Sequence, residues 1–326
     1  MERASRSSEL AYRDLQGKFV LPVVDSDAVR CGLREWMVVN KNWIQDSSDC
    51  YGAVLFHGFN IRSVADFNGV ATAICGHLMR HNGEHVPAER GSAVQRPVAY
   101  PPESKLLWHN ENSFNDSWPT KIIFGCTKSA DEGGHTLLVD ARKVCSQLDE
   151  SIRKSFTERG VMYVRTYGDA VGVHWRYVFG TDKREDVERK CTELGFTYDW
   201  DPTDPNILVT RCVRPAVLKH FRTGEESWFC QPQHWHLACL APETRRLLEA
   251  TFPADRLPRN CHYGDGTPIS DSTMESLSGV YRGLEAKLLL EEGDILLIDN
   301  VLVAHGRDPY VGRRDILVAL GDCLAY

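Results

Sequence analysis

The chain has 326 residues, of which 42% are hydrophobic and 25% charged, and its formal net charge is -7 at pH 7. This length and hydrophobic content suit one large core, and a net negative charge without a long basic block disfavours nucleic acid as a partner. Eleven scattered cysteines, no apolar stretch of membrane-spanning length and no apolar signal core at residues 1–8 lead us to expect a cytoplasmic protein in a reducing compartment.

Two capping patterns stand in the N-terminal part of the chain. Ser26 or Asp27 precedes one stretch with helical spacing of apolar residues, and Ser63 begins a capping box, Ser-Val-Ala-Asp, before another. A stretch rich in apolar residues, bounded by glycine, lies between them and indicates a strand. The expected elements are a helix over residues 27–38, a strand over residues 51–56, and a helix from the capping box to about residue 81.

A short apolar run, Leu106-Leu107-Trp108, predicts a buried strand that leads into His109 and Glu111. Side chains two apart in a strand point the same way, so His109 and Glu111 could project from one face and bind one ion. The His-x-Glu pattern also occurs by chance in many proteins, and hydrogen-bonded core histidines are the alternative. A second histidine elsewhere in the chain would favour a metal site over hydrogen-bonded core histidines.

Four helices are expected between this motif and the C-terminal strands, over residues 149–159, 182–194, 242–250 and 272–285. The first two are followed by Gly160 and Gly195, residues typical of helix C-termini. Short strands with interspersed helices favour a mainly β fold with α decoration, a jelly roll surrounded by helices, over a parallel α/β sheet.

The second histidine is His305, which follows a strand expected over residues 294–299. Together with His109 and Glu111, it would place two imidazoles and one carboxylate on one side of an ion. That arrangement leaves three coordination positions open, as in the non-haem Fe(II) oxygenases. We therefore predict that these three residues form a metal triad.

An arginine pair follows this histidine after a turn marked by Pro309 and Gly312. The apolar run after Arg314 predicts a strand that returns beside His305. A guanidinium at that position could clamp a dicarboxylate through two parallel hydrogen bonds, which a lysine could not reproduce. The alternative is an exposed turn in which Arg313 and Arg314 have no ligand.

These segments resemble the TauD/TfdA-type Fe(II)/2-oxoglutarate dioxygenases, and within them the SyrP-like and clavaminate-synthase-like amino-acid oxygenases, which carry His-x-Glu where taurine dioxygenase carries His-x-Asp. The resemblance runs from about Arg96 to Asp322. Its segments are Tyr100-Pro101-Pro102, His109-Asn110-Glu111, Asp131-Glu132-Gly133-Gly134-His135-Thr136, Gly160-Val161-Met162-Tyr163-Val164-Arg165, His220-Phe221-Arg222-Thr223-Gly224-Glu225, Trp228-Phe229-Cys230-Gln231, Tyr263-Gly264-Asp265-Gly266, and the stretch from Asp299 to Arg314.

The resemblance implies a double-stranded β-helix, or jelly roll, in a single domain over residues 1–326, with the metal-bearing part from about residue 96 and an N-terminal part over about residues 1–95. It implies that Fe(II) is the cofactor and that 2-oxoglutarate and O₂ are the co-substrates. Thr136 and Arg314 are implied to hold the far carboxylate of 2-oxoglutarate. The implied ligands of the iron are His109, Glu111 and His305.

The His-x-Glu relatives imply a substrate that is an amino acid or a derivative of one, free or tethered to an acidic carrier protein, in natural-product biosynthesis. The expected reaction is oxidation of an unactivated C–H bond, above all hydroxylation. Related halogenases lack the carboxylate supplied here by Glu111, which implies that no halide is incorporated. Arg165, Arg211 and Arg307 are candidates for binding a substrate carboxylate. Cys230 stands where relatives usually carry asparagine.

Three alternatives stay open from the sequence. Basic runs at residues 153–154, 183–184 and 189–190 could bind an acidic carrier or could simply be solvated helix faces. The substrate could be a sulfonate or a trimethylammonium compound in catabolism, and an aromatic cage would support the latter. The chain could also be a zinc-binding jelly-roll protein without catalytic activity, and the candidate zinc ligands are then Cys230, His234, His236 and Cys239.

Overall fold

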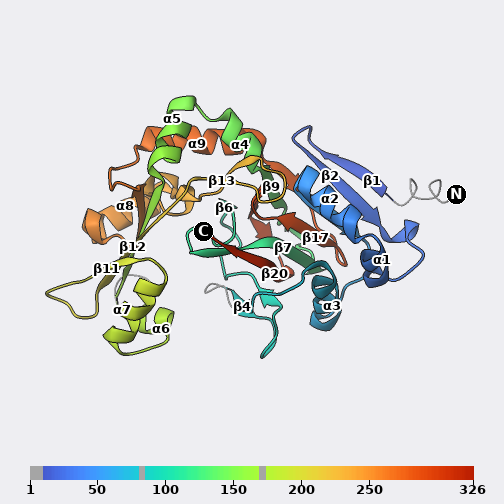
Figure 1. Ribbon diagram of the computed structural model, residues 1–326, viewed down its shortest axis with the longest axis horizontal. Coiled ribbons are helices and arrows are strands. Elements are labelled where there is room, and N and C mark those ends of the chain that lie inside the picture. The colour runs from blue at the N-terminus through green and yellow to red at the C-terminus, as the bar shows by residue number, and fades with distance from the viewer. Residues whose placement is uncertain (1–9, 81–84, 169–173) are drawn as a thin grey trace.

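The computed structural model of the chain describes residues 10–80, 85–168 and 174–326, and Figure 1 shows strands at its centre with helices around them. A larger sheet has the order β1-β2-β3-β17-β7-β20-β5-β4, and a smaller one the order β16-β9-β18-β6. The bounds of the larger sheet are β1 Leu10–Leu15, β2 Phe19–Asp25, β3 Ala53–His57, β17 Ile295–Asp299, β7 Ser117–Lys128, β20 Asp315–Ala325, β5 Gln95–Arg96 and β4 Val86–Pro87; those of the smaller are β16 Ala286–Leu288, β9 Thr136–Asp140, β18 Val303–Arg307 and β6 Leu106–His109.

These two sheets face each other across one apolar layer. Leu296 and Ile298 of β17 pack in that layer against Leu138 of β9. The alternate residues of the same strand, Ile295 and Leu297, pack on the opposite face beneath the N-terminal helices. Every residue of β17 is buried because both faces of the sheet are covered. The two facing sheets form the jelly-roll core that the sequence predicted.

Helices cover the outer faces of both sheets. The apolar sides of α1, α2 and α3 pack on the larger sheet, and those of α4, α5 and α9 pack on the smaller sheet, where Figure 1 shows them side by side. The helices are α1 Leu33–Val39, α2 Lys41–Tyr51, α3 Val64–Ile74, α4 Ala141–Gln147, α5 Glu150–Arg159, α6 Trp175–Phe179, α7 Arg184–Glu193, α8 Pro242–Thr251 and α9 Asp271–Leu284. None of the helices in the described residues is both long and apolar enough to cross a bilayer.

A third sheet has the order β11-β12-β10-β15, and its strands are antiparallel. Its inner face carries Tyr163 and Cys212, which share the apolar cluster of the smaller sheet. The strands of this sheet are β11 Thr197–Trp200, β12 Leu208–Arg214, β10 Val161–Tyr167 and β15 Arg259–Tyr263; the remaining short pairs are β13 Val217–Lys219 with β14 Glu226–Trp228, and β8 Glu132–Gly133 with β19 Tyr310–Val311.

The four helices expected after the His-x-Glu motif are confirmed as α5, α7, α8 and α9, each within two residues at either end. Asp149 caps α5 by accepting hydrogen bonds from the backbone N–H groups of Ser151 and Ile152. Gly160 follows this helix with φ +71, a backbone conformation that glycine adopts without steric cost. Capping chemistry therefore located these helices reliably.

The prediction of one helix over residues 27–38 is wrong at its start. Residues Ser26–Ala28 form a single 3-10 turn, and α1 begins only after Gly32, whose extended backbone separates the two. Ser63 caps α3 as expected, with its Oγ accepting from the N–H of Asp66, but this helix ends at Ile74 instead of near residue 81, which lies outside the described residues. The sequence analysis also missed α2, which begins directly after α1 with only Asn40 between them.

Candidate metal centre

Three predicted ligands come together at the edge of the smaller sheet. His109 ends β6 and His305 lies in β18, and the two residues are cross-strand partners with ring centroids 4.4 Å apart. Nε2 of His109 lies 4.0 Å from Oε2 of Glu111. One ligand atom from each of the three residues lies within 4.8 Å of the others. Two imidazoles and one carboxylate therefore converge on a single point.

The route by which Glu111 reaches that point differs from the expectation. Strand β6 ends at His109, so Glu111 does not share a strand face with it. The chain turns instead, and Asn112 takes a left-handed backbone with φ +59. His305 follows the strand expected over residues 294–299, which is β17, and lies in the next strand, β18. The three side chains converge, but the expectation that His109 and Glu111 share one face of a strand is wrong.

The environment of the two imidazoles suits metal binding. Nδ1 of His109 donates a hydrogen bond to the carbonyl of Leu107 at 2.9 Å, which leaves Nε2 without a proton on the side facing Glu111. Burial and the neighbouring imidazoles of His109 and His85 hold the pKa of His305 well below its usual range, so that its ring is neutral. Neutral imidazole is the form that binds a metal ion. Among the described residues, the buried Nδ1 of His305 has no hydrogen-bond partner.

Two buried asparagines fix the backbone of the Glu111 turn. Oδ1 of Asn300 accepts from the N–H of Glu111 at 2.7 Å, and its Nδ2 donates to the carbonyls of Glu111 at 2.9 Å and of Pro119 at 2.8 Å. In addition, Nδ2 of Asn110 donates to the backbone carbonyl of Asn300 at 2.6 Å. Asn300 begins the loop that leads to His305, so both halves of the triad are tied to one another.

Asn300→Ala is therefore expected to weaken Fe(II) binding by roughly 10- to 100-fold, the usual effect of losing a residue that orients a metal ligand. An anaerobic Fe(II) titration would measure it, with Mn(II) electron paramagnetic resonance as a second readout. Asn40→Ala is a matched control, because Asn40 caps α1 by donating to the carbonyl of Trp36. An unchanged Fe(II) affinity in Asn300→Ala would mean that the turn holds Glu111 without this residue.

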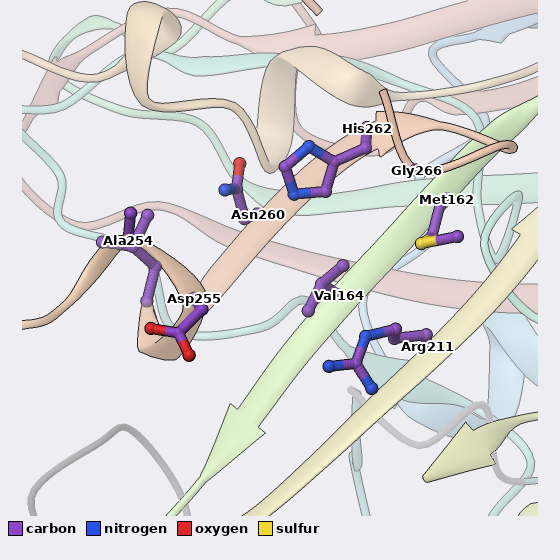
Figure 2. Close-up of a pocket in the computed structure, with 9 residues that line it drawn as sticks. Met162, Val164, Arg211, Ala254, Asp255, Asn260, His262 and Gly266 are labelled. Carbon is purple, nitrogen blue, oxygen red and sulfur yellow. The ribbon is translucent and has the colours of Figure 1, made fainter. Parts of the chain in front are cut away.

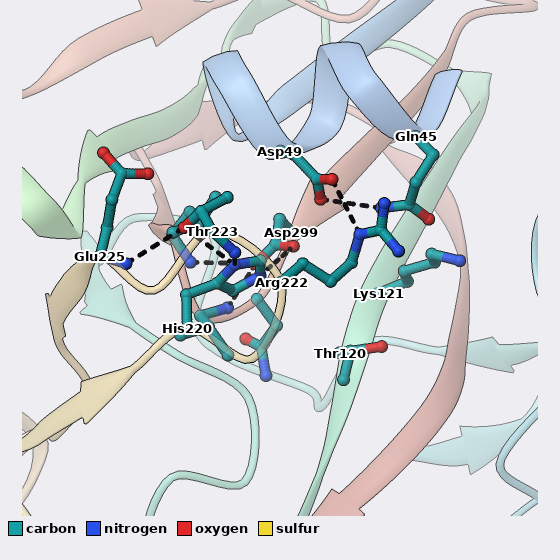
Figure 3. A network of polar contacts seen from close by, with 12 residues as sticks. Gln45, Asp49, Thr120, Lys121, His220, Arg222, Thr223, Glu225 and Asp299 are labelled. Carbon is teal, nitrogen blue, oxygen red and sulfur yellow. Dashed lines mark hydrogen bonds and ion pairs between the residues drawn. The ribbon is translucent and has the colours of Figure 1, made fainter. Parts of the chain in front are cut away.

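A second group of potential ligands, Asp49, His220 and Asp299, is saturated by protein contacts (Figure 3). Nδ1 of His220 accepts from the N–H of Thr223, so its Nε2 donates to Oδ2 of Asp299 at 3.1 Å. Oδ1 of Asp299 accepts from the N–H groups of Val301 and Leu302. Asp49 pairs with Nε of Arg222 at 2.8 Å. This network shapes the loop before His305 and leaves no acceptor directed at an ion.

Thr136 and Arg314 stand at the starts of two different strands. Thr136 is buried at the start of β9, opposite Arg307 of β18. Arg314 immediately precedes β20, which pairs with β7 and β5. The expected strand therefore exists but belongs to the sheet that faces His305, and not to the sheet that contains it.

The two neighbouring arginines have opposite environments. Burial lowers the pKa of Arg314, the charge of Arg307 lowers it further, and no carboxylate of a described residue lies at ion-pairing distance from it. The side chain of Arg313 is 81% exposed and lies 3.9 Å from a carboxylate oxygen of Asp315. A partly desolvated guanidinium without a protein carboxylate gains stability when an anion pairs with it. The environment of Arg314 therefore suits binding of a dicarboxylate. Arg313 is exposed and already lies near the carboxylate of Asp315.

The three arginines predicted to bind substrate lie in different environments. The guanidinium of Arg307 donates to the backbone carbonyls of Pro101, Pro102 and Ser104, and so holds that loop against β18. Arg211 is on the outer face of the third sheet, where it pairs with Asp199. Arg211 also lines a pocket of about 330 Å³, which Figure 2 shows over the strands. Arg165 is on the opposite, inner face of this sheet.

The candidate zinc ligands make separate contacts. His234 donates from Nε2 to the carbonyl of Leu107 and packs edge-on against His109 at 4.9 Å. His236 donates to the carbonyl of Ile269. Together with Cys230 and Cys239 they form no converging group in the described part of the chain.

The sequence analysis missed His85, whose Nε2 lies 3.9 Å from Oε1 of Glu111, and the ring of Phe124, 5.3 Å from that of His305. No motif marks either residue. Asn300 stood inside a recognised segment, Asp299 to Arg314, but its role depends on contacts that the sequence does not reveal. The contacts of these three residues with the triad are visible only in the folded chain.

Comparison with known proteins identifies the family. A model of the "Taurine catabolism dioxygenase TauD, TfdA family" matches residues 13–320. Dapdiamide synthesis protein DdaC of Enterobacter agglomerans is 30% identical over 272 residues, which cover 83% of this chain and 82% of DdaC. A clavaminate synthase-like protein of Arabidopsis thaliana is 27% identical over 281 residues, covering 82% of this chain and 81% of that protein.

Solved structures share the fold at low identity. PvcB of Pseudomonas aeruginosa is 13% identical with a TM-score of 0.55, covering 98% of this chain and 94% of PvcB. AAD-2, solved with Mn(II) and N-oxalylglycine, is 14% identical with a TM-score of 0.52, covering 96% of each chain. The family match bears out the enzyme class and cofactors that the sequence predicted. The chain belongs to the TauD/TfdA family, and it is an Fe(II)- and 2-oxoglutarate-dependent dioxygenase.

Proposed function

We propose that the protein hydroxylates an unactivated C–H bond of an amino acid, or of an amino-acid derivative, in natural-product biosynthesis. His109, Glu111 and His305 hold Fe(II), and Thr136 and Arg314 hold the far carboxylate of 2-oxoglutarate. The observation that carries this proposal is the convergence of one ligand atom from each of His109, Glu111 and His305 within 4.8 Å of one another.

The roles of the side chains follow from their places. When bound, the iron and 2-oxoglutarate supply O₂ activation, with 2-oxoglutarate converted to succinate and CO₂. Arg314 orients the co-substrate through a bidentate contact, while the hydroxyl of Thr136 offers a further hydrogen bond. The ring of Phe124 covers one side of His305 and keeps water away from it. The carbonyl of Leu107 keeps the ring of His109 in its ligating orientation.

The relatives support a biosynthetic substrate. DdaC is named for dapdiamide synthesis, and PvcB is described as an oxygenase from an isonitrile synthetic pathway. At Trp235, which follows the histidine that packs against His109, a trimethylammonium group is disfavoured, because the guanidinium of Arg259 already lies 5.3 Å from the ring of Trp235. A second cation on that ring would be repelled. We therefore place amino acids ahead of trimethylammonium compounds.

The surface offers little support for an acidic carrier. The basic runs that could have formed a docking patch have acidic neighbours on the same or adjacent elements. Arg153 lies 3.8 Å from Glu226, Lys154 lies 3.8 Å from Glu158, and Arg189 contacts Asp186 at 2.8 Å. These pairs reduce the net positive potential of the helices. We therefore favour a free substrate over a carrier-tethered one.

Product analysis under oxygen-18-labelled O₂ tests the proposal. The protein, reconstituted with Fe(II) and 2-oxoglutarate in chloride buffer, is offered free amino acids, their thioesters, taurine and a trimethylammonium compound. We expect succinate together with an amino-acid product that has gained one labelled oxygen and no chlorine, because Glu111 fills the position that a halide would need. Oxidation of taurine alone would replace the proposal with the catabolic alternative. A chlorinated product would contradict the role given to Glu111.

A further inference from the structure

A buried histidine on the β13–β14 hairpin contacts the end of β17, the strand that precedes the loop to His305. This residue, His220, is 1% exposed and follows β13 directly. Its Nδ1 accepts a hydrogen bond from the backbone N–H of Thr223 at 3.1 Å. Its Nε2 lies 3.1 Å from Oδ2 of Asp299, as Figure 3 shows, and must carry the proton that it donates to this carboxylate. Both ring nitrogens are therefore used by protein contacts.

The carboxylate of Asp299 depends on this donor. Asp299 ends β17 and is almost completely buried. Its Oδ1 accepts from the backbone N–H groups of Val301 at 2.9 Å and Leu302 at 3.0 Å. A buried carboxylate is costly unless hydrogen bonds replace its lost water. In the described part of the chain, Nε2 of His220 is the donor that meets the other oxygen, Oδ2.

The turn that Asp299 stabilises carries the asparagine that fixes Glu111. Residues 300–302 form the whole connection between β17 and β18. The N–H of Asn300 donates to the carbonyl of Thr120 at 2.9 Å, and the other two N–H groups donate to Asp299. The side chain of Asn300 bonds to both the N–H and the carbonyl of Glu111. A change in the orientation of the Asp299 carboxylate would therefore be transmitted to the backbone of Glu111.

The loop that carries His220 is tied to helices on both sheets. Nε of Arg222 lies 2.8 Å from Oδ2 of Asp49 in α2, which packs on the larger sheet. Glu225 lies 3.1 Å from Nη1 of Arg142 in α4, which packs on the smaller sheet. These contacts limit the motion of the loop, so the imidazole is a fixed donor for the turn.

We propose that His220 is a positioning residue for the iron ligand Glu111, acting through the carboxylate of Asp299 and the side chain of Asn300. The inference rests on the proposed function, in which Glu111 binds Fe(II). His220 does not bind the metal itself, because neither of its ring nitrogens is free. Its contribution is to hold the Glu111 turn in place before the metal binds, which reduces the rearrangement that binding requires.

Two substitutions at residue 220 separate the hydrogen bond to Asp299 from the other contact of the ring. His220→Asn keeps an acceptor near the position of Nδ1 but has no donor that reaches Asp299, whereas His220→Gln places an amide N–H near the position of Nε2. We expect His220→Asn to weaken Fe(II) binding about tenfold, the lower end of the range for residues that orient a metal ligand, because it acts through further residues. His220→Gln should keep most of the wild-type affinity.

Hydrogen–deuterium exchange of the metal-free protein gives a readout that is independent of iron. The backbone N–H groups of Glu111, Val301 and Leu302 should exchange faster in His220→Asn than in the wild type, because their acceptors are no longer fixed. In the Asn300→Ala background, His220→Asn should cause no further loss of Fe(II) affinity, since the two residues belong to one series of contacts. Lys219→Gln is the control, because it changes an exposed residue of the same hairpin, and its Fe(II) affinity should equal that of the wild type.

Wild-type Fe(II) affinity in His220→Asn would overturn the inference, and equal losses in the asparagine and glutamine variants would also overturn it by assigning the histidine a packing role. If His220→Asn does not fold, Asp299→Asn provides the second test. It breaks the same hydrogen bond from the other side, and its oxygen can still accept from Val301 and Leu302. Wild-type affinity in Asp299→Asn would again overturn the inference. Wild-type Fe(II) affinity in Glu111→Ala would instead overturn the proposed function.

Discussion

Replacing His305 by alanine is expected to abolish Fe(II) binding and succinate formation while the chain stays folded. Each triad residue supplies one of three protein ligands, so its loss should weaken Fe(II) binding by more than about 100-fold, the upper range for residues that only orient ligands. His109→Ala should behave in the same way. Anaerobic titration with Fe(II) measures the affinity, and succinate detection measures turnover.

The matched control is His77→Ala, which removes an exposed histidine near the C-terminal strand β20. This control should bind Fe(II) as the wild type does, with the same midpoint of thermal unfolding. For the carboxylate ligand, Glu111→Asp should keep partial activity, because the ligand chemistry survives a shorter side chain, and Glu111→Ala should lose most of it. Iron-dependent succinate formation at the wild-type rate in either histidine variant would remove the triad from consideration.

Arg314→Lys is expected to raise the KM for 2-oxoglutarate about tenfold or more, because a single ammonium replaces a bidentate guanidinium fork. The affinity for the substrate undergoing oxidation should change less. Steady-state kinetics over a range of 2-oxoglutarate concentrations measures the effect, and isothermal titration of the anaerobic Fe(II) protein separates binding from turnover.

Arg313→Lys is the comparison that this chain offers, since Arg313 is adjacent and exposed. Its KM for 2-oxoglutarate should stay within about twofold of the wild-type value, as expected when an exposed, weakly paired charge is kept. A larger effect from Arg313→Lys than from Arg314→Lys would show that the neighbouring arginine binds the co-substrate.

The sequence located the candidate ligands because their chemistry is local. His109 and Glu111 lie two positions apart, and the turn residues after His305 mark where a strand returns. The fold class followed from short strands and well-capped helices such as α5. The cross-strand pairing of His109 with His305 could not be derived, because register is set by packing between segments that are distant in sequence.

The misplaced features have physical causes as well. A strand periodicity was extended through Glu111, but Asn300 and Asn110 stabilise a turn there through side-chain hydrogen bonds. Gly32 divides a stretch that has helical spacing on both sides. Each of these features depends on a contact between residues that no single motif contains.

The hydrogen bonds of Asn110 and Asn300 that fix the Glu111 turn also bear on how the chain folds. Its hydrogen bonds join residues 189 and 190 positions apart in the sequence, and contacts of such high sequence separation form late because closing a long loop is entropically unfavourable. A nascent chain that has not yet added β18 to the smaller sheet would present one histidine and an unfixed carboxylate. The complete set of three ligands is therefore present only once β18 has joined the smaller sheet.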